Sequence, residues 1–385
     1  MSASHPVGVP LCDILAQYHE LQPQFDAALA RVLASGQVIN GPDVAALENE
    51  VAAYCDASHG VGCGSGTEAL SLALTALEIG PGDEVILPTF TFFATAGSVA
   101  RTGARPVFVD IDPDTYNLDP AQVAEKITPR TRAIIAVHLF GQAADMTPLW
   151  HLAERHNLPI IEDAAQAMGA EYQQKRAGSL GLIGCLSFYP SKNLGAFGDA
   201  GMCVTSDPAL AHRMTVLRNH GMEPKYYHKY IGWNGRLDTV QACMLRVKLP
   251  HLDRWIAGRQ TAGYRYDALI EENRLSNFLD RPVTAPQRRH TYNQYVVRVA
   301  RGERDAVVRH LKSESVGCEI YYPVPLHLQE CLGYLGHEAG DFPVSEAAAR
   351  CVLALPMFPE ITEEQQARVV GSIASYLRKG MRRAA

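Results

Sequence analysis

The chain has 385 residues, enough for one large domain or two medium-sized domains with a sizeable core. Its 47% hydrophobic and 20% charged residues are ordinary for a globular protein, and the net charge of −6 argues against a nucleic-acid-binding protein. No apolar stretch is long enough for a membrane helix and no signal-peptide pattern is present, so neither a membrane-spanning nor a secreted protein is expected.

The spacing of the cysteines bears on the cellular compartment, and the spacing of the histidines bears on metal binding. The nine cysteines are scattered singly with no Cys-x-x-Cys pair, which indicates a reducing environment, so we expect a cytoplasmic protein without disulfides. The fourteen histidines lack the paired spacing of a metal site, so no metal is expected.

Two helices are predicted at the start of the chain. Helical periodicity covers residues 21–33, and residues 36–41 interrupt it. Pro42 then suits the first turn of a second helix. The apolar face of that helix consists of Val44, Leu47, Val51 and Tyr54.

A glycine-rich segment, residues 61–70, leads into a third helix. Ser65 and Glu68 form a capping-box pattern there. A helix N-terminus behind a glycine-rich turn binds anions well, and Gly66 and Thr67 would line it, although a plain capped helix explains the pattern equally well. The segment matches neither the dinucleotide fingerprint nor the Walker phosphate loop.

Strands and helices then alternate. Strands are expected at residues 84–87, 106–111, 133–139 and 158–161, with helices between them, which predicts a mainly parallel sheet covered on both faces. Ligands bind such sheets beyond the carboxyl ends of the strands. The polar residues at those ends are His138, Asp163, Gln166 and Lys192. Taken singly, His138 is equally well a satisfied core histidine and Asp163 a helix N-cap.

Lys192 follows a predicted strand, residues 183–189, and precedes a glycine-rich turn. Partial desolvation on such a loop would lower the pKa of the amine, and a free amine can form a Schiff base. An isolated lysine of this kind is most simply a surface residue, so its neighbours decide the interpretation.

The C-terminal third lacks the regular alternation of strands and helices predicted for the preceding part. A long helix from Asp238 to Val247 is followed by Pro250, which we expect to kink it. Further elements are expected at residues 292–299 (strand), 304–313 (helix), 318–322 (strand) and 363–377 (helix). We therefore predict a large α/β domain over residues 1–250 and a smaller α+β domain over residues 251–385.

A Schiff-base lysine suggests pyridoxal 5′-phosphate, which needs a phosphate site, a carboxylate at the ring nitrogen and an aromatic cover. The chain offers Asp163 for the ring nitrogen, and Phe92 or Phe90 for the cover, one of these two being a core residue. The phosphate candidates are Gly66, Thr67 and Ser187. Lys192 would also be the base that moves the substrate proton.

Motifs along nearly the whole chain support this interpretation. They are Gly64-Ser65-Gly66-Thr67-Glu68-Ala69-Leu70, Pro81-Gly82-Asp83-Glu84-Val85-Ile86, Val137-His138-Leu139-Phe140-Gly141-Gln142, Glu162-Asp163-Ala164-Ala165-Gln166-Ala167, Ser187 to Gly195, Leu217-Arg218-Asn219-His220-Gly221, Gly232-Trp233-Asn234-Gly235-Arg236-Leu237, Tyr322-Pro323-Val324-Pro325-Leu326-His327 and Leu355-Pro356-Met357-Phe358-Pro359. In these the chain resembles the DegT-type (DegT/StrS) nucleotide-sugar aminotransferases. They are pyridoxal-phosphate enzymes of fold type I, with a mixed, mostly parallel sheet flanked by helices.

The resemblance implies roles for individual residues. Lys192 matches the Schiff-base lysine, Asp163 the partner of the ring nitrogen, and Gln166 the contact to the ring hydroxyl. Asn234 matches a residue that reaches the phosphate of the neighbouring subunit, which implies a homodimer with shared sites. The remaining positions are Gly66, Thr67 and Ser187 at the phosphate, and Tyr189, His220 and His327 near the sugar.

Two local features bear on the substrate. The segment after Lys192 is similar to family members that aminate C3 of a 3-keto sugar, rather than to those acting at C4. Met168 stands where many members have histidine. The resemblance thus implies transfer of an amino group from L-glutamate to a UDP- or dTDP-linked keto sugar.

Four alternatives remain. One is an aminotransferase for a 4-keto sugar. A dehydratase of the same fold would carry histidine in place of Lys192. A non-catalytic regulator that binds pyridoxal phosphate or a sugar nucleotide would not need the complete set of Lys192, Asp163 and Gln166. A nicotinamide-dependent oxidoreductase would need the glycine fingerprint, which is missing.

Overall fold

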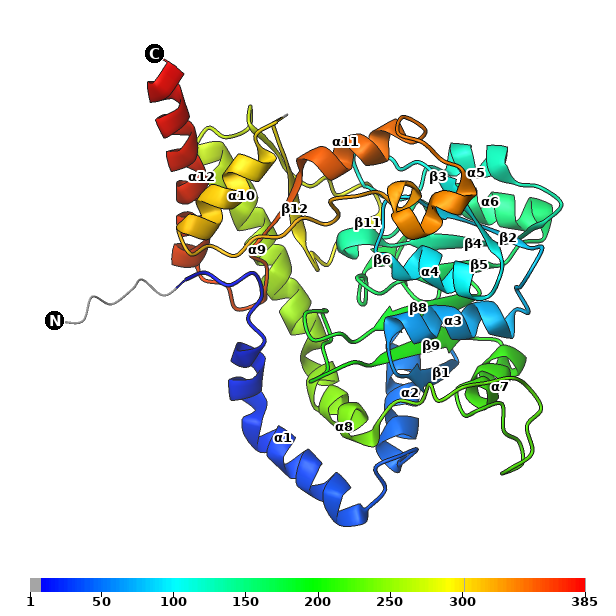
Figure 1. Cartoon of the computed structure of the whole chain (residues 1–385). Coiled ribbons are helices and arrows are strands. Elements are labelled where there is room, and N and C mark those ends of the chain that lie inside the picture. Colours follow the sequence, from blue (N-terminus) through cyan, green and yellow to red (C-terminus); the bar gives the residue numbers. More distant parts are fainter. Residues whose placement is uncertain (1–7, 301, 385) are drawn as a thin grey trace.

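The computed structural model describes residues 8–300 and 302–384, with side chains through Arg378. Its main sheet has seven strands in the order β1-β9-β8-β5-β4-β2-β3 (Figure 1). The neighbours from β8 to β3 pair in parallel, whereas β9 is antiparallel to both β8 and β1. The strands are β1 (His59–Cys63), β2 (Glu84–Pro88), β3 (Arg105–Val109), β4 (Thr131–Val137), β5 (Ile160–Asp163), β8 (Ile183–Ser187) and β9 (Gly201–Thr205). The predicted mixed, mostly parallel sheet is confirmed.

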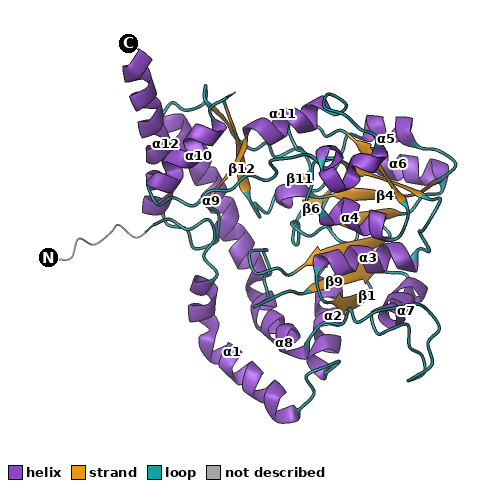
Figure 2. Ribbon diagram, viewed as in Figure 1, coloured by secondary structure: helices purple, strands orange, loops and turns teal. Residues whose placement is uncertain are grey.

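Helices cover both faces of this sheet (Figure 2). Side chains alternate along β2, so Val85 and Leu87 join the core on one face and Ile86 the core on the other. The first face carries α3 (Gly66–Ala76), α4 (Ala94–Arg101) and α7 (Pro208–Leu217). The second carries α2 (Pro42–Tyr54), α5 (Pro120–Lys126), α6 (Met146–His156) and α8 (Thr239–Lys248). The apolar strands therefore have no solvent-facing side.

The first helix is longer than predicted. Helix α1 (Leu15–Ser35) begins at Leu15 rather than at residue 21. The carboxylate of Asp13 accepts the main-chain N–H groups of Leu15 and Ala16 at 2.9 and 3.2 Å, and so satisfies donors that a helix start leaves free. At the other end, Gly36 adopts φ 66°, which ends the helix in the left-handed conformation that glycine accepts without strain.

The C-terminal part builds a second core around α9 (Leu252–Glu272). Pro250, where we expected a kink, lies in a short 3₁₀ turn, η2 (Leu249–His251), between α8 and α9. A three-stranded antiparallel sheet consists of β10 (Leu279–Asp280), β12 (Tyr295–Val299) and β13 (Val352–Leu355). Helices α10 (Arg304–Ser313), α11 (Pro343–Cys351) and α12 (Glu363–Ala384) complete this part. The division into domains 1–250 and 251–385 stays a prediction.

Several strand predictions need correction. Strands β3 and β4 each end two residues before the predicted position, and β12 begins three residues after it. Strand β8 ends at Ser187, two residues before the predicted end. The predicted strand over residues 318–322 is wrong, because only Glu319 pairs there, in a single bridge to Ala354. Pro323 and Pro325 follow at once and have no N–H groups with which to continue a ladder, so the chain turns into the 3₁₀ turn η3 (Leu326–Leu328).

Helix α11 is capped from the main sheet. Asp110, buried after β3, accepts the N–H groups of Val344 and Ser345 at 2.9 and 2.8 Å, and the Ser345 hydroxyl at 2.5 Å. An acid at a helix N-terminus satisfies free donors and the helix dipole together. This contact fixes a C-terminal helix to the large sheet. None of the helices in the described ranges is long and apolar enough to cross a membrane.

The remaining short elements are β6 (Glu171–Tyr172), β7 (Lys175–Arg176) and β11 (Arg288–Arg289), which form a small separate sheet, and the 3₁₀ turns η1 (Leu139–Gly141) and η4 (Glu330–Leu335).

Candidate active site

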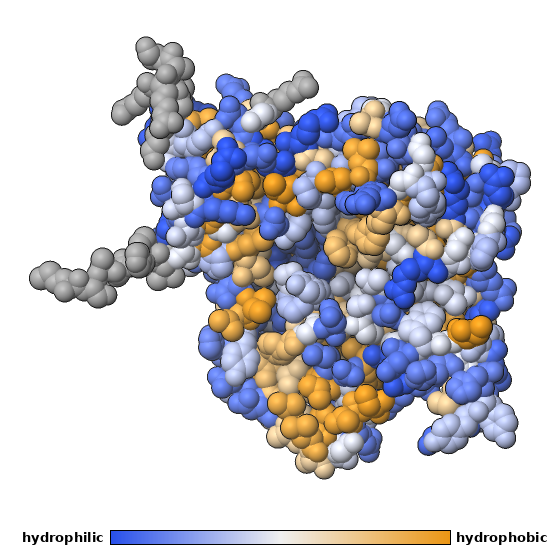
Figure 3. All heavy atoms as spheres, viewed as in Figure 1, coloured by the Kyte–Doolittle hydropathy of each residue, from blue (hydrophilic) through white to orange (hydrophobic). Residues whose placement is uncertain are grey.

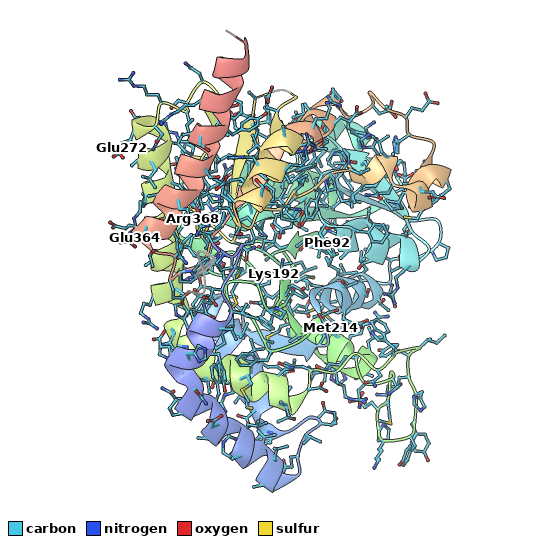
Figure 4. All side chains as sticks on the ribbon, turned by 60° about the vertical axis from the view of Figure 1, so that its left-hand side comes forward. Phe92, Lys192, Met214, Glu272, Glu364 and Arg368 are labelled. Atoms are coloured by element: carbon cyan, nitrogen blue, oxygen red, sulfur yellow. The ribbon has the colours of Figure 1, made fainter. Side chains whose placement is uncertain are left out.

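The candidate residues gather at the carboxyl edge of the main sheet. Asp163 ends β5, Ser187 ends β8, and the loop after β8 carries Lys192. Lys192 and Phe92 both lie near the middle of the view in Figure 4. Because the parallel strands share one direction, their carboxyl ends bring these groups to one edge, as the rule for ligand sites in such sheets predicts.

The start of α3 packs closely against the end of β8. The Ser65 hydroxyl accepts the N–H of Glu68 at 3.1 Å, which confirms the predicted cap. The Glu68 carboxylate completes no capping box and instead accepts the indole N–H of Trp233. A Cβ on Gly66 would lie 2.7 Å from the Ser187 Cβ, so only glycine allows this close approach. The helix N-terminus and the Ser187 hydroxyl together form a site suited to an anion.

Asp163 is buried and has one well-bonded oxygen. Its Oδ2 accepts the hydroxyl of Thr95 at 2.7 Å, while Oδ1 accepts only a long hydrogen bond of 3.3 Å from the Ala165 N–H. Thr95 lies on α4, in a different part of the sequence. The Oδ1 atom therefore retains acceptor capacity for a ligand.

The neighbouring acid, Glu162, points to the other face of the sheet. Its carboxylate accepts the N–H groups of Gly178 and Gly181, each at 2.7 Å, and lies 2.8 Å from Nε2 of His138. The Nδ1 atom of His138 accepts the N–H of Ala144 at 3.1 Å, so Nε2 carries the proton. His138 is fully buried, which favours the core alternative for this residue over a functional one.

Gln166 is held by two contacts. Its Oε1 accepts the N–H of Phe140 at 2.7 Å, and its Nε2 donates to the Tyr322 hydroxyl at 3.1 Å. Burial raises the pKa of Tyr322, so the phenol stays protonated at neutral pH. The second Nε2 proton of Gln166 has no partner in these two contacts and is available to a ligand oxygen.

The two phenylalanine candidates differ clearly in solvent exposure. Phe90 is fully buried in the core, whereas Phe92 is 56% exposed. Phe92 borders a hollow of about 450 Å³ that is also lined by Thr67, Phe93, Arg101 and Cys331. None of Lys192, Asp163 and Gln166 lines this hollow. The exposure of its ring alone therefore leaves Phe92 free to cover a ligand, and Phe90 is the core residue of the pair.

The loop carrying Lys192 is tightly fixed. The N–H of Lys192 donates to the Tyr189 carbonyl at 2.8 Å, and the buried Lys248 ammonium donates to the Gly195 carbonyl at 2.6 Å. Burial lowers the pKa of Lys192 to about 8, although the attraction of Asp163 for the ammonium partly opposes the shift. The expected reactive amine therefore has a physical basis in the fold.

The other predicted residues are more dispersed. Tyr189 is 55% exposed beside Ser187, and His220 and Asn234 are exposed on the segment between α7 and α8. His327 is buried, with Nδ1 2.8 Å from the Thr89 hydroxyl and Nε2 3.3 Å from Glu346. Both of its ring nitrogens thus have partners within the chain.

Residues 19–374 match the model of the DegT/DnrJ/EryC1/StrS aminotransferase family. The chain belongs to this family. It is 49% identical over 372 residues to the "Pleiotropic regulatory protein" of Geobacillus stearothermophilus, covering 97% of this chain and 99% of that protein. It is 46% identical over 362 residues to the UDP-N-acetyl-3-dehydro-α-D-glucosamine 3-aminotransferase of Acidithiobacillus ferrooxidans, covering 94% and 96%.

The fold agrees with this membership. The crystal structure of S. venezuelae DesV in complex with a ketimine intermediate superposes with a TM-score of 0.92 at 44% identity, over 96% of this chain and 98% of that one. The aminotransferase described here therefore has the fold type I architecture expected from its motifs.

Three contacts near the site of this aminotransferase could not be predicted from the sequence. The Thr95–Asp163, Tyr322–Gln166 and Lys248–Gly195 pairs each join residues more than fifty positions apart. Tyr322 stands in a recognised motif, which was its only signal. Thr95 and Lys248 sit in helices whose periodicity carries no sign of a polar role.

Proposed function

We propose that this aminotransferase takes the amino group of L-glutamate and transfers it to a nucleotide-linked 3-keto sugar, using pyridoxal 5′-phosphate. The observation that carries the proposal is the reactive pair at the sheet edge. Burial lowers the pKa of Lys192 to about 8, and the buried carboxylate of Asp163 lies near enough to influence that amine. At pH 7 about a tenth of such lysines carry a free amine.

The residues present fit the cofactor. Gly66, Thr67 and Ser187 would hold its phosphate at the start of α3, where a Cβ at Gly66 would collide with Ser187. Asp163 Oδ1 would accept a hydrogen bond from the protonated ring nitrogen, and the free Nε2 proton of Gln166 would bond the ring hydroxyl. Phe92 would cover the ring. Bound in this way, the cofactor would withdraw electrons from the carbon that bears the amino group.

Each residue then has a defined task. Lys192 would hold the cofactor through its amine and, once an amino substrate replaces it there, would be the base that moves the proton between the substrate carbon and the cofactor. Asp163 would keep the ring nitrogen protonated. Two half-reactions at one site imply ping-pong kinetics, first with glutamate and then with the keto sugar.

The sugar assignment rests on two supports. The segment Asn193-Leu194-Gly195 follows Lys192 as in C3-acting members, and a relative at 46% identity is named a 3-aminotransferase of a UDP-linked sugar. Among the proposed sugar contacts, Tyr189 and His220 are exposed, whereas His327 is buried. The alternative 4-keto sugar is distinguished by assay.

A second copy of the chain would complete the site. Asn234 would reach the partner's phosphate site, as the family motif implies. Its exposure supports this, as do the exposed Tyr226, Tyr227 and Ile231 nearby. Exposed apolar residues in the last turn of α1 and just after it add to the surface that a partner could cover; they include Leu33, Val38 and Ile39. Figure 3 shows an apolar area at its lower end, over this part of the molecule. We propose a homodimer that acts in the cytoplasm, in line with nine free cysteines.

The test begins with the visible absorption of the purified protein after addition of pyridoxal phosphate. A yellow band that disappears on adding L-glutamate supports both the cofactor and the donor. UDP- and dTDP-linked 3-keto and 4-keto sugars are then compared by release of 2-oxoglutarate. Preference for 4-keto sugars would refute the sugar assignment, and a protein that stays colourless would refute the proposal.

One variant separates the enzyme from a regulator, an alternative raised by the name of the relative at 49% identity. Lys192→Ala should abolish turnover, while the exposed Lys126→Ala control should retain it. Glutamate-dependent amination by Lys192→Ala would contradict the mechanism. No 2-oxoglutarate from the wild type with any keto sugar would favour the regulator.

A further inference from the structure

Two buried threonine hydroxyls stand behind Asp163. Thr95, in the first turn of α4, is fully buried, and its Oγ1 lies 2.7 Å from Asp163 Oδ2. The Oγ1 atom of the buried Thr91 lies 3.2 Å from Thr95 Oγ1. The three side chains therefore form a continuous chain of hydrogen bonds that begins on the loop after β2 and ends at the carboxylate.

The direction of this chain follows from the donors available. An ionised carboxylate only accepts hydrogen bonds, so the Thr95 hydroxyl must donate its single proton to Asp163. The Thr95 oxygen is then left as the acceptor for the Thr91 hydroxyl. Successive hydroxyls in a buried site polarise each other, which strengthens the bond that reaches the carboxylate.

The backbone holds the donor in place. The N–H of Thr95 donates to the carbonyl of Phe92 at 3.2 Å, so the ring proposed to cover the cofactor and the hydroxyl behind Asp163 belong to one turn. A threonine side chain has restricted χ1 freedom in a helix, which limits how far this hydroxyl can move. Its hydroxyl bonds a side chain on β5 rather than its own helix, which is not the behaviour of an ordinary helix-capping threonine.

We propose that Thr95 is the positioning residue for Asp163, with Thr91 supporting it. The Thr95 hydroxyl donates a hydrogen bond to Oδ2 and thereby fixes the rotation of the carboxylate, so that Oδ1 faces the ring nitrogen of the cofactor. The inference rests on the function proposed above, in which Asp163 meets that nitrogen. Thr95 itself touches neither cofactor nor substrate.

The test compares the holoenzymes of Thr95→Val, Thr95→Ser and Thr91→Val. Valine keeps the shape and removes the hydroxyl, whereas serine keeps the hydroxyl. We measure kcat and KM for glutamate, and the pH titration of the visible absorption of the bound cofactor. The control is Thr205→Val. Thr205 lies at the end of β9, and its buried hydroxyl donates to the Leu182 carbonyl at 2.7 Å rather than to Asp163.

Thr95→Val should lower kcat by roughly ten- to a hundredfold, as expected for loss of a hydrogen bond to a charged group, with KM for glutamate changed less than about threefold. The absorption titration should shift. Thr95→Ser should restore kcat to within about threefold of the wild type, and Thr91→Val should show a smaller loss of about two- to fivefold. The control should leave the absorption titration unchanged.

A Thr95→Val enzyme with wild-type kcat and an unshifted titration would overturn the inference, as would a Thr95→Ser enzyme no better than Thr95→Val. If Thr95→Val does not fold, Thr91→Val decides, because it must shift the titration while Thr205→Val does not. Failure of the proposed function is recognised separately: the wild type would then show no cofactor band or no response to glutamate, and the role of Thr95 would fall with it.

Discussion

Replacing the reactive lysine should stabilise the protein while it destroys activity. Burial lowers the pKa of Lys192 to about 8 from its ordinary value of 10.5. The fold therefore keeps an ammonium group where water solvates it poorly. At about 1.4 kcal/mol per pH unit, this costs the cofactor-free protein about 3 kcal/mol of unfolding free energy at pH 7.

The variant is Lys192→Met, which keeps the unbranched shape and most of the length of the side chain and removes the charge. The attraction between the Lys192 ammonium and Asp163 is already included in the lowered pKa, so the expected gain at pH 7 is up to about 3 kcal/mol. The gain depends on pH with a definite sign. Between about pH 8 and 10.5 the unfolded wild type binds more protons than the folded one, so wild-type stability rises and the advantage of the variant disappears.

The assay is denaturant or thermal unfolding of the cofactor-free proteins at pH 7 and at pH 10. Lys126→Met is the control, because Lys126 is exposed and its replacement should change stability by less than about 0.5 kcal/mol at either pH. A Lys192→Met protein that is no more stable than the wild type at pH 7, or equally favoured at both pH values, would refute the argument from burial.

Two further variants test the frame of the site. Gly66→Ala should weaken pyridoxal-phosphate binding at least about tenfold in an absorption titration, because the new Cβ would lie 2.7 Å from Ser187, whereas Gly371→Ala, with open space around it, should leave binding unchanged. Asp110→Ala should lower the unfolding free energy by about 2–4 kcal/mol in thermal unfolding, because donors on Val344 and Ser345 lose their acceptor. Unchanged cofactor binding by Gly66→Ala would contradict the close approach of Gly66 to Ser187, and unchanged stability of Asp110→Ala would contradict the cap on α11.

The sequence predicted the sheet and its reactive edge well because both depend on local patterns. Apolar runs of strand length and the Ser65 cap are visible in short windows. The parallel arrangement then places Asp163 and the loop of Lys192 at one edge without further information. Sequence alone does not show which of Phe92 and Phe90 is buried, since both stand in the same short segment and only the fold decides.

Contacts between distant segments were beyond the sequence. The bond from Thr95 to Asp163 joins α4 and β5, which are far apart in the sequence. The start of α1 is a different case: Asp13 lies only two residues before Leu15 and is a local capping signal outside the apolar periodicity. The false strand over residues 318–322 reflects a β-rich composition, which the two prolines that follow override in the fold. Such features arise from packing, which competes with local preference.

Because Asp110 caps α11, the predicted domain boundary at residue 250 does not divide the chain into two parts that are stable on their own. A fragment that ended at residue 250 would leave the Asp110 carboxylate without the helix it caps. It would also strip the core on the α3 and α4 face of its C-terminal members; these are Leu326, Leu332, Leu335, Phe342 and Ala348. The amino-terminal 250 residues alone should therefore aggregate, and the active edge should form only once the last third of the chain has been synthesised and has folded back onto it.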